Sequence, residues 1–325
     1  LYTARNYPRE WWNRLAFVCE PTGHLVGSFV LSRDGAGYRS TSPFNLVASV
    51  DEWASPTMAE IGPDGNVWVI DWYNFIIQHN PTPQGFQTGK GNAYESELRD
   101  KKHARIYRVV YEGNDGLPKD QLASANKLVE KGLDPNNEKL LVAALKHPNF
   151  LWRKIAQRLL IEKGKLSSET LAALSGLLND KSVDSVGLNV GAIHALWVLK
   201  GIGETIPTTA ALGHPSPSVR RNAVQTSDES LVSLQAISKG NLLADDDAQV
   251  RLASLLKIAD CEASEPGLVS ALANPTLIAT LPGSNKTDSW LLDAWTSAAS
   301  AHWEAVLPKL LAVSEPQLSL IHISE

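Results

Sequence analysis

The chain has 325 residues and a formal net charge of -5 at pH 7, with 43% hydrophobic and 20% charged residues. This is the composition of an ordinary globular protein of two or three domains. The acidic balance gives no reason to expect nucleic acid as a partner, and no run approaches the roughly 18 apolar residues of a transmembrane segment. The two cysteines, Cys19 and Cys261, lie far apart and predict no disulfide framework.

Short strand-like runs separated by turn residues fill the first third of the sequence. After a polar lead-in at residues 2–12, strands are expected at 14–19, 24–31, 38–41, 45–49, 67–70 and 105–111. A tight turn at residues 62–65, Gly-Pro-Asp-Gly, precedes the strand at 67–70, and a polar and aromatic cluster at 71–74 follows it. A turn, a buried strand and a polar cluster in this order are typical of a β-propeller blade.

The long polar stretch at residues 75–104 is expected to be a functional or disordered loop. Two glycines and a proline within residues 112–118 mark a domain boundary. The predicted domains are a partial β-propeller of about two blades at 1–113, a linker at 114–118 and a helical domain at 119–317.

From Lys119 the apolar residues recur at helical spacing. A phrase with His147-Pro148 and Arg153 returns as His214-Pro215 with Arg220, and again as Asp245 with Arg251. Repeats of about 30 to 40 residues built from helix pairs predict a HEAT-like α-solenoid, and an irregular helical bundle is the alternative. The predicted fold class is therefore a β plus α multidomain protein, in which the C-terminal blades of a β-propeller precede an all-α HEAT-like solenoid.

The ends of the sequence suggest an internal fragment. The chain opens at Leu1 in the middle of a sequence pattern, and its single methionine is Met58. Residues 318–325 break the preceding helical pattern, and we expect them to be a non-native tail.

Several phrases resemble one bacterial family: YPREWWNR at 7–14, CEPTGHL at 19–25, IDWYN at 70–74 and RIYRV at 105–109. The family is the membrane-bound dehydrogenases of planctomycete and verrucomicrobial type. Its members join a sorbosone/glucose-dehydrogenase-like propeller to HEAT repeats and a C-terminal cytochrome c domain. No Cys-x-x-Cys-His occurs here, so the resemblance implies that haem c belongs to a domain outside this sequence.

The resemblance implies a periplasmic or exported oxidoreductase that oxidises a sugar or a related alcohol or aldehyde. Its cofactor would be the quinone PQQ, and its electrons would pass to cytochrome c. We expect this fragment alone to be inactive, with no transmembrane segment and no metal site. The alternative is a non-catalytic propeller and solenoid scaffold that binds carbohydrate or protein.

The candidate site residues lie at strand ends and in adjacent loops. His79 and His24 are candidates for the general base, and Asp71 is the third catalytic candidate. The candidate cofactor-binding residues are Arg14, Glu20, Trp72, Asn74, Asn80 and Arg105, with the arginines on a quinone carboxylate. The structural alternative is that Asp71 and Asn74 cap turns and that the histidines satisfy backbone groups. Trp53, Trp68 and Trp72 either stack on a ring or pack in the core.

Overall fold

The structure is a computed structural model of the chain. It describes residues 1–75, 77, 84–85, 87–88, 94–95, 100, 102–204, 208–274 and 288–313. The chain divides into two compact units. The first consists of Leu1–Ser32, Arg39–Asp134 and His147–Ile155, and the second of Arg33–Tyr38, Pro135–Lys146 and Ala156–Glu325. The predicted tail at 318–325 lies outside the described residues.

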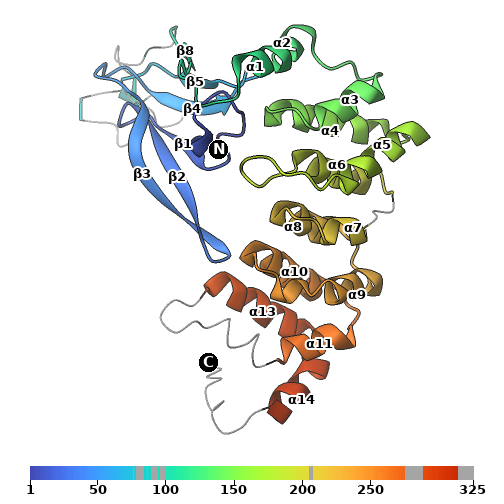
Figure 1. Ribbon diagram of the computed structural model, residues 1–325. Coiled ribbons are helices and arrows are strands. Elements are labelled where there is room, and N and C mark those ends of the chain that lie inside the picture. The colour runs from blue at the N-terminus through green and yellow to red at the C-terminus, as the bar shows by residue number, and fades with distance from the viewer. Residues whose placement is uncertain are drawn as a thin grey trace. The chain divides into compact units, whose positions relative to one another are not determined.

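The strands belong to small antiparallel sheets (Figure 1). They are β1 (Leu15–Glu20), β2 (Leu25–Asp34), β3 (Gly37–Ala48), β4 (Pro56–Ile61), β5 (Val67–Asp71), β6 (Gln87–Thr88), β7 (Tyr94–Glu95) and β8 (Arg105–Val109). One three-stranded sheet has the order β1-β2-β3, a second has the order β4-β5-β8, and β6 pairs with β7. In the second sheet Val69 lies opposite Ala59 on β4 and Tyr107 on β8.

The predicted fold class was wrong. The described residues show separate three-stranded sheets and helices, without the closed ring of blades that a propeller requires, and the chain is a mixed α/β protein. The prediction failed because alternating residues and turn spacing report only that a strand is half buried in an antiparallel sheet. The arrangement of the sheets depends on which side chains cover their faces, and the lead-in segment supplies that cover.

Residues 2–12, expected to be a polar lead-in, form the core of the first unit. The rings of Tyr2 and Tyr7 stack at 4.5 Å, and both side chains are fully buried. The Tyr2 hydroxyl donates to the Gly65 carbonyl at 3.1 Å, while the Tyr7 hydroxyl accepts from the Val67 N–H at 3.0 Å. Burial raises the pKa of Tyr7 to about 12, so this hydroxyl stays protonated at neutral pH. These bonds attach the lead-in to the turn and first residue of β5.

The central strand β5 matches its prediction. Val67, Val69 and Asp71 are buried while Trp68 and Ile70 are exposed, as the period of two requires. Gly65 has a φ of +79°, and its N–H donates to the Gly62 carbonyl, which confirms the predicted tight turn. By contrast, β3 continues through Pro43, where the sequence predicted a break. Proline is tolerated there because β3 is an edge strand of its sheet.

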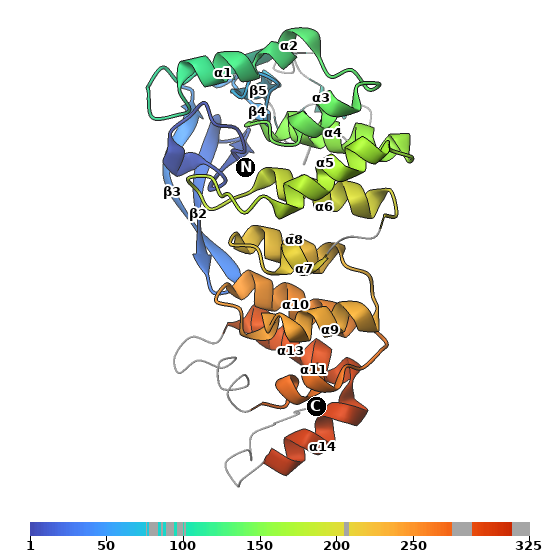
Figure 2. The ribbon, with the colours of Figure 1, turned by 45° about the vertical axis from the view of Figure 1, so that its right-hand side comes forward.

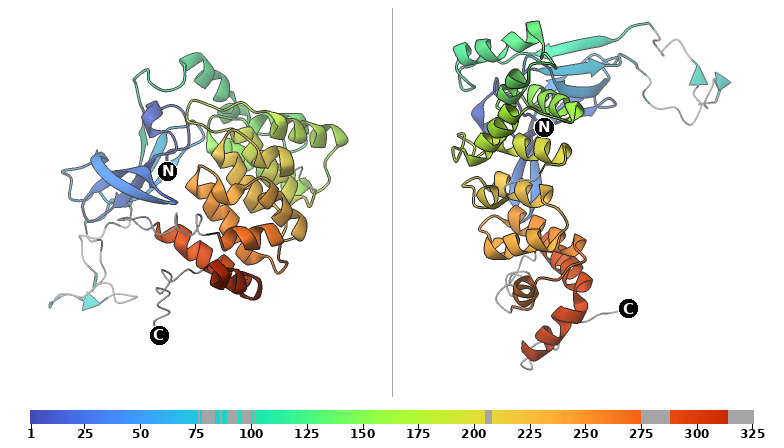
Figure 3. Two further views of the ribbon diagram at one scale, coloured as in Figure 1. Left: turned by 60° about the horizontal axis from the view of Figure 1, so that its bottom comes forward. Right: turned by 90° about the vertical axis from the view of Figure 1, so that its right-hand side faces the viewer.

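Helices follow residue 118 (Figure 2). They are α1 (Lys119–Ala125), α2 (Lys127–Lys131), α3 (Glu138–Ala144), α4 (Phe150–Lys163), α5 (Ser168–Asn179), α6 (Val190–Gly201), α7 (Thr208–Leu212), α8 (Pro217–Thr226), α9 (Leu231–Lys239), α10 (Ala248–Asp260), α11 (Pro266–Leu272), α13 (Ser289–Ala301) and α14 (Trp303–Val313). Short 3-10 turns cover Arg9–Trp11 and Leu242–Ala244. In the second unit α5 packs on α6, α6 on α8, α8 on α10 and α10 on α13. Figure 3 shows the ribbon from two further sides.

A local motif recurs at the starts of three helices. Arg153, Arg220 and Arg251 each donate to the carbonyl six residues earlier, at 2.5, 2.8 and 2.6 Å. The residue that carries the carbonyl, His147, His214 or Asp245, also accepts from the N–H two residues ahead through its side chain. These two hydrogen bonds join the turn to the first part of the helix that follows it. They explain why a His or Asp recurs six residues before an Arg in the sequence.

None of the helices in the described part of the chain is long and apolar enough to cross a membrane.

Candidate functional site

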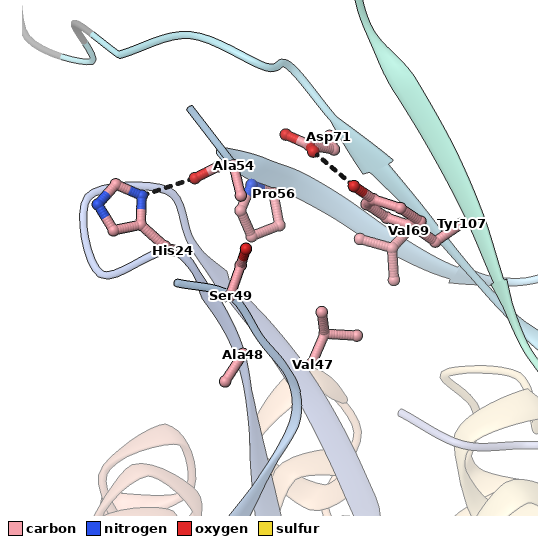
Figure 4. A pocket seen from close by; sticks show the side chains of 9 residues that line it. All are labelled: His24, Val47, Ala48, Ser49, Ala54, Pro56, Val69, Asp71 and Tyr107. Atoms are coloured by element: carbon pink, nitrogen blue, oxygen red, sulfur yellow. Dashed lines mark hydrogen bonds between the residues drawn. The ribbon is translucent and has the colours of Figure 1, made fainter. Parts of the chain in front are cut away.

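A pocket of about 220 Å³ lies in the first unit, where strand ends from both sheets meet (Figure 4). Its lining comes from the turn before β2, the end of β3, the segment entering β4, and strands β5 and β8. The lining residues are His24, Val47, Ala48, Ser49, Ala54, Pro56, Val69, Asp71 and Tyr107. We call this cavity the sheet-end pocket. Its apolar walls and few polar groups are the usual composition of a small-molecule site.

Asp71 is the polar anchor of the sheet-end pocket. It is fully buried at the end of β5 and accepts three hydrogen bonds. Its Oδ1 accepts from the N–H groups of Ser55 and Tyr73 at 2.6 and 2.9 Å, and its Oδ2 accepts from the Tyr107 hydroxyl at 3.1 Å. A carboxylate held in this way stays in one place and orients the Tyr107 hydroxyl.

Tyr107 connects Asp71 to a charged pair at the pocket's edge. Arg105 donates from Nη1 to the Tyr107 hydroxyl and from Nη2 to Asp51 Oδ2, both at 3.1 Å. The hydrogen bond with Tyr107, followed by that with Asp51, raises the pKa of the Arg105 guanidinium. The bond from the Trp53 N–H lowers the pKa of Asp51 most, and Arg105 lowers it further against the opposing effect of burial, so this ion pair is charged at neutral pH.

His24 borders the pocket, and one of its ring nitrogens makes a hydrogen bond to the backbone. Its Nδ1 lies 2.7 Å from the Ala54 carbonyl oxygen, which can only accept, so Nδ1 carries the proton. Nε2 is then an acceptor in the neutral ring, and it has no hydrogen-bond partner among the described residues. Ser49 is held nearby because its Oγ accepts from the Asp51 N–H at 3.0 Å and its own N–H donates to the His24 carbonyl.

An aromatic surface adjoins the polar groups. The rings of Trp53 and Tyr73 lie 5.7 Å apart, and those of Trp53 and Phe75 lie 5.9 Å apart. The Arg105 guanidinium lies 3.7 Å from the centre of the Tyr73 ring, in cation–π contact. Trp53 and Tyr73 are half-buried and Phe75 is exposed, so part of each ring is open to a ligand.

Two residues at this site have left-handed backbone. His24 and Tyr73 both have a φ of +56°. A bulky aromatic residue is an outlier in this region, and such conformations gather at binding sites, where surrounding bonds maintain them. The Tyr73 N–H bond to Asp71 and the His24 ring bond to Ala54 are those restraints here.

Residues 1–113 match the model of a domain of unknown function, DUF7133. Every residue that lines the sheet-end pocket lies within the matched segment. No curated protein matches the chain. No solved structure matches it either.

The structure brings two of the predicted catalytic residues, His24 and Asp71, to the same pocket. The third, His79, lies outside the described residues, as does Asn80 from the cofactor set. Arg105 lies beside the pocket through its bond to Tyr107.

The other predicted cofactor residues do not line the sheet-end pocket. Asn74 is buried, and its N–H and carbonyl both bond to the Ser55 hydroxyl. Trp72 donates its N–H to the Ser55 carbonyl, Glu20 accepts from the Gly23 N–H, and Arg14 donates to the Leu31 carbonyl from an exposed position. The described residues assigned to the quinone therefore form no common site for it in this pocket.

Tyr107, Ser49, Asp51 and Tyr73 are site residues that sequence reasoning missed. The period of two along β8 places Arg105 and Tyr107 on one side of the strand, and that alternation was the available signal. Asp51 and Ser49 lie in a segment without a motif, and only the fold brings them to the pocket. Among the residues that the structure describes, no group of three or more His, Cys, Asp or Glu is arranged to hold a metal ion.

Proposed function

We propose that the first unit binds a carbohydrate in the sheet-end pocket, with the aromatic surface of Trp53, Tyr73 and Phe75 as part of the site. The observation that carries this proposal is the junction of open aromatic rings with an ordered set of hydrogen-bonding groups. A sugar has apolar C–H faces, which pack on aromatic rings, and hydroxyls that both donate and accept hydrogen bonds.

The polar groups are suited to hydroxyls because they include both donors and acceptors. His24 Nε2 accepts, Ser49 Oγ can donate and accept, and the Tyr107 hydroxyl oxygen is presented by its bonds to Asp71 and Arg105. The volume of about 220 Å³ is below the roughly 300–1,000 Å³ of drug-sized pockets. We therefore expect one sugar ring or a chain end to bind, with the remainder on the aromatic surface.

The test is a fluorescence titration of the full chain with glucose, galactose, xylose and cellobiose. We expect saturable binding of at least one of them. Trp53→Ala should weaken that affinity by roughly tenfold, because stacking on an aromatic side chain contributes about 1–1.5 kcal/mol. Trp290→Ala is the matched control, since it removes an exposed tryptophan of the second unit. Equal losses in the two variants, or no binding of any sugar, would reject the proposal.

A second candidate is oxidation of the bound sugar, which the family resemblance implies. It is supported by one observation, the His24 ring at the pocket's edge, whose Nε2 has no hydrogen-bond partner among the described residues and is a candidate to take a hydroxyl proton. The cytochrome c partner and the periplasmic location belong to this candidate and rest on the resemblance alone. None of the predicted quinone residues that the structure describes lines the pocket, so binding is the better supported function.

Dye reduction separates the two candidates. The full chain, supplied with PQQ and the sugar that binds best, should reduce an acceptor dye if oxidation occurs, and His24→Gln should abolish that reduction. Binding without dye reduction would reject the oxidation and leave the binding function in place.

A further inference from the structure

The first unit has a second cavity, of about 290 Å³, on the side of the domain linker. We call it the linker pocket. It lies among the lead-in segment, the ends of β5 and β8, the linker and α1 (elements labelled in Figure 1). Its lining residues are Asn6, Asn66, Arg108, Val110, Tyr111, Gly113, Asn114, Leu117, Pro118, Lys119, Leu122 and Asn126. None of them lines the sheet-end pocket.

The wall of the linker pocket carries two cations, and the carboxylates of Asp64 and Asp115 bond to lining residues and offset part of that charge. Its ionisable lining residues are Arg108, Lys119 and Tyr111. The hydrogen bond from the Tyr111 hydroxyl to Asp115, and then burial, raise the pKa of Tyr111, so it is a neutral group at neutral pH. Arg108 and Lys119 are therefore the charges that a ligand meets on the pocket wall.

The two cations retain hydrogen-bonding capacity. Arg108 uses Nε on Asp64, and among the described residues its Nη1 and Nη2 have no hydrogen-bond partner. Lys119 has no ion pair or hydrogen bond from its Nζ within the described part of the chain. Burial alone raises the pKa of Asp64, but bonds from Asn66, Trp68 and Arg108 outweigh it and lower that pKa. Asp64 is thus ionised and offsets part of the Arg108 charge, and Lys119 is the lining cation outside this pair.

The walls of the linker pocket are formed in advance. The Leu117 N–H donates to the Arg5 carbonyl at 2.8 Å, and Asn6 Nδ2 donates to the Asp64 carbonyl at 2.9 Å. Gly116 lies so close to the lead-in that a Cβ there would be 2.3 Å from the Asn6 carbonyl oxygen. Because linker and lead-in are joined this tightly, a ligand need not order the linker when it binds.

We infer that the linker pocket binds a small organic oxyanion, a carboxylate or a phosphate, with its charge at Arg108 and Lys119. The side-chain amide of Asn114 can donate a neutral hydrogen bond, whereas that of Asn66 already donates to Asp64 at 2.9 Å. Leu117 and Leu122 supply an apolar wall for a short carbon chain. This site is separate from the sugar site, so it stands or falls independently of the proposed function.

The test is calorimetric titration of the full chain with sodium butyrate and with sodium phosphate, against sodium chloride at equal ionic strength. We expect saturable binding of butyrate or phosphate, and the tighter of the two identifies the anionic group. Lys119→Gln should weaken the affinity about tenfold, the usual effect of losing a charged hydrogen bond, and Lys119→Glu should abolish it. Arg108→Gln is a second variant that should also weaken the affinity. Because it breaks the ion pair with Asp64, a thermal melt of this variant checks that the chain is still folded.

Lys139→Glu is the matched control, since Lys139 is an exposed residue of α3 outside the pocket and the change in net charge is the same. It should leave the affinity unchanged. Equal affinities for Lys119→Glu and Lys139→Glu, or a response that chloride reproduces, would overturn the inference.

Discussion

Removal of the Asp71 carboxylate should disrupt the sheet-end pocket and destabilise the first unit. Asp71 is fully buried and accepts from two backbone N–H groups and from the Tyr107 hydroxyl. Asp71→Ala leaves these donors without their acceptor, and each unsatisfied buried donor costs about 1–3 kcal/mol. Since Tyr107 can turn towards the cavity, the two backbone groups carry most of the penalty. We therefore expect a loss of about 3–5 kcal/mol.

Asp71→Asn provides the finer test. The amide oxygen can still accept from the Ser55 and Tyr73 N–H groups, so only the charge and one acceptor are lost. We expect a loss of about 1–2 kcal/mol, because hydrogen bonds to charged groups contribute about that much more than neutral ones. The measurement is urea unfolding followed by tryptophan fluorescence. Glu52→Ala, an exposed neighbour in the same unit, should change the stability by less than about 0.5 kcal/mol. If Asp71→Ala behaved like this control, the anchoring role of Asp71 would be refuted.

Three further predictions concern stability. Gly116→Ala should destabilise the chain because the added Cβ would lie 2.3 and 2.9 Å from the Asn6 and Arg5 carbonyl oxygens. Gly176→Ala in α5 should stabilise the chain by about 0.5–1 kcal/mol, because a Cβ there has no neighbour within 4 Å. Thermal melts measure both variants, and a more stable Gly116→Ala than Gly176→Ala would contradict this packing. Asp245→Asn should cost about 2–4 kcal/mol because Arg220 bonds both carboxylate oxygens at 2.7 Å in a mostly buried pair, and a neutral result in chemical unfolding would refute it. Burial lowers the pKa of His147 and His214, so the unfolded chain binds more protons and stability should fall as pH drops below about 6.5. That fall should be smaller in a His147→Asn, His214→Asn double variant, and equal slopes would argue against it.

The sequence predicted local structure better than arrangement. The turn at 62–65 and the strand of Val67 and Val69 are confirmed because their signals are local: glycine at a positive φ and a period of two. Local signals also act at Asp247, which caps α10 because its side chain accepts from the Gln249 N–H. The propeller prediction was wrong because local strand signals do not specify how the sheets are arranged. The bonds of Tyr2 and Tyr7 to Gly65 and Val67 come from a segment whose mixed composition looked polar.

The candidate site shows the same contrast between local signals, which the sequence reveals, and arrangement, which it does not. His24 and Asp71 were identified from the sequence because polar residues at strand ends are recognisable in a single chain. Tyr107 and Ser49 were missed because they become site residues only when β8 and the end of β3 are brought beside β5, across long sequence separations. The described residues assigned to the quinone do not line the sheet-end pocket, and Asn74, for example, bonds to Ser55 instead.

The most direct test of the central claim is the NMR signal of the His24 ring during titration with the sugar that binds best. Carbohydrate in the sheet-end pocket should shift the His24 ring resonances saturably, while those of His302, buried in the second unit, stay unchanged. A sugar that binds with no change at His24, or with equal changes at both histidines, would contradict the assignment of this pocket as the carbohydrate site.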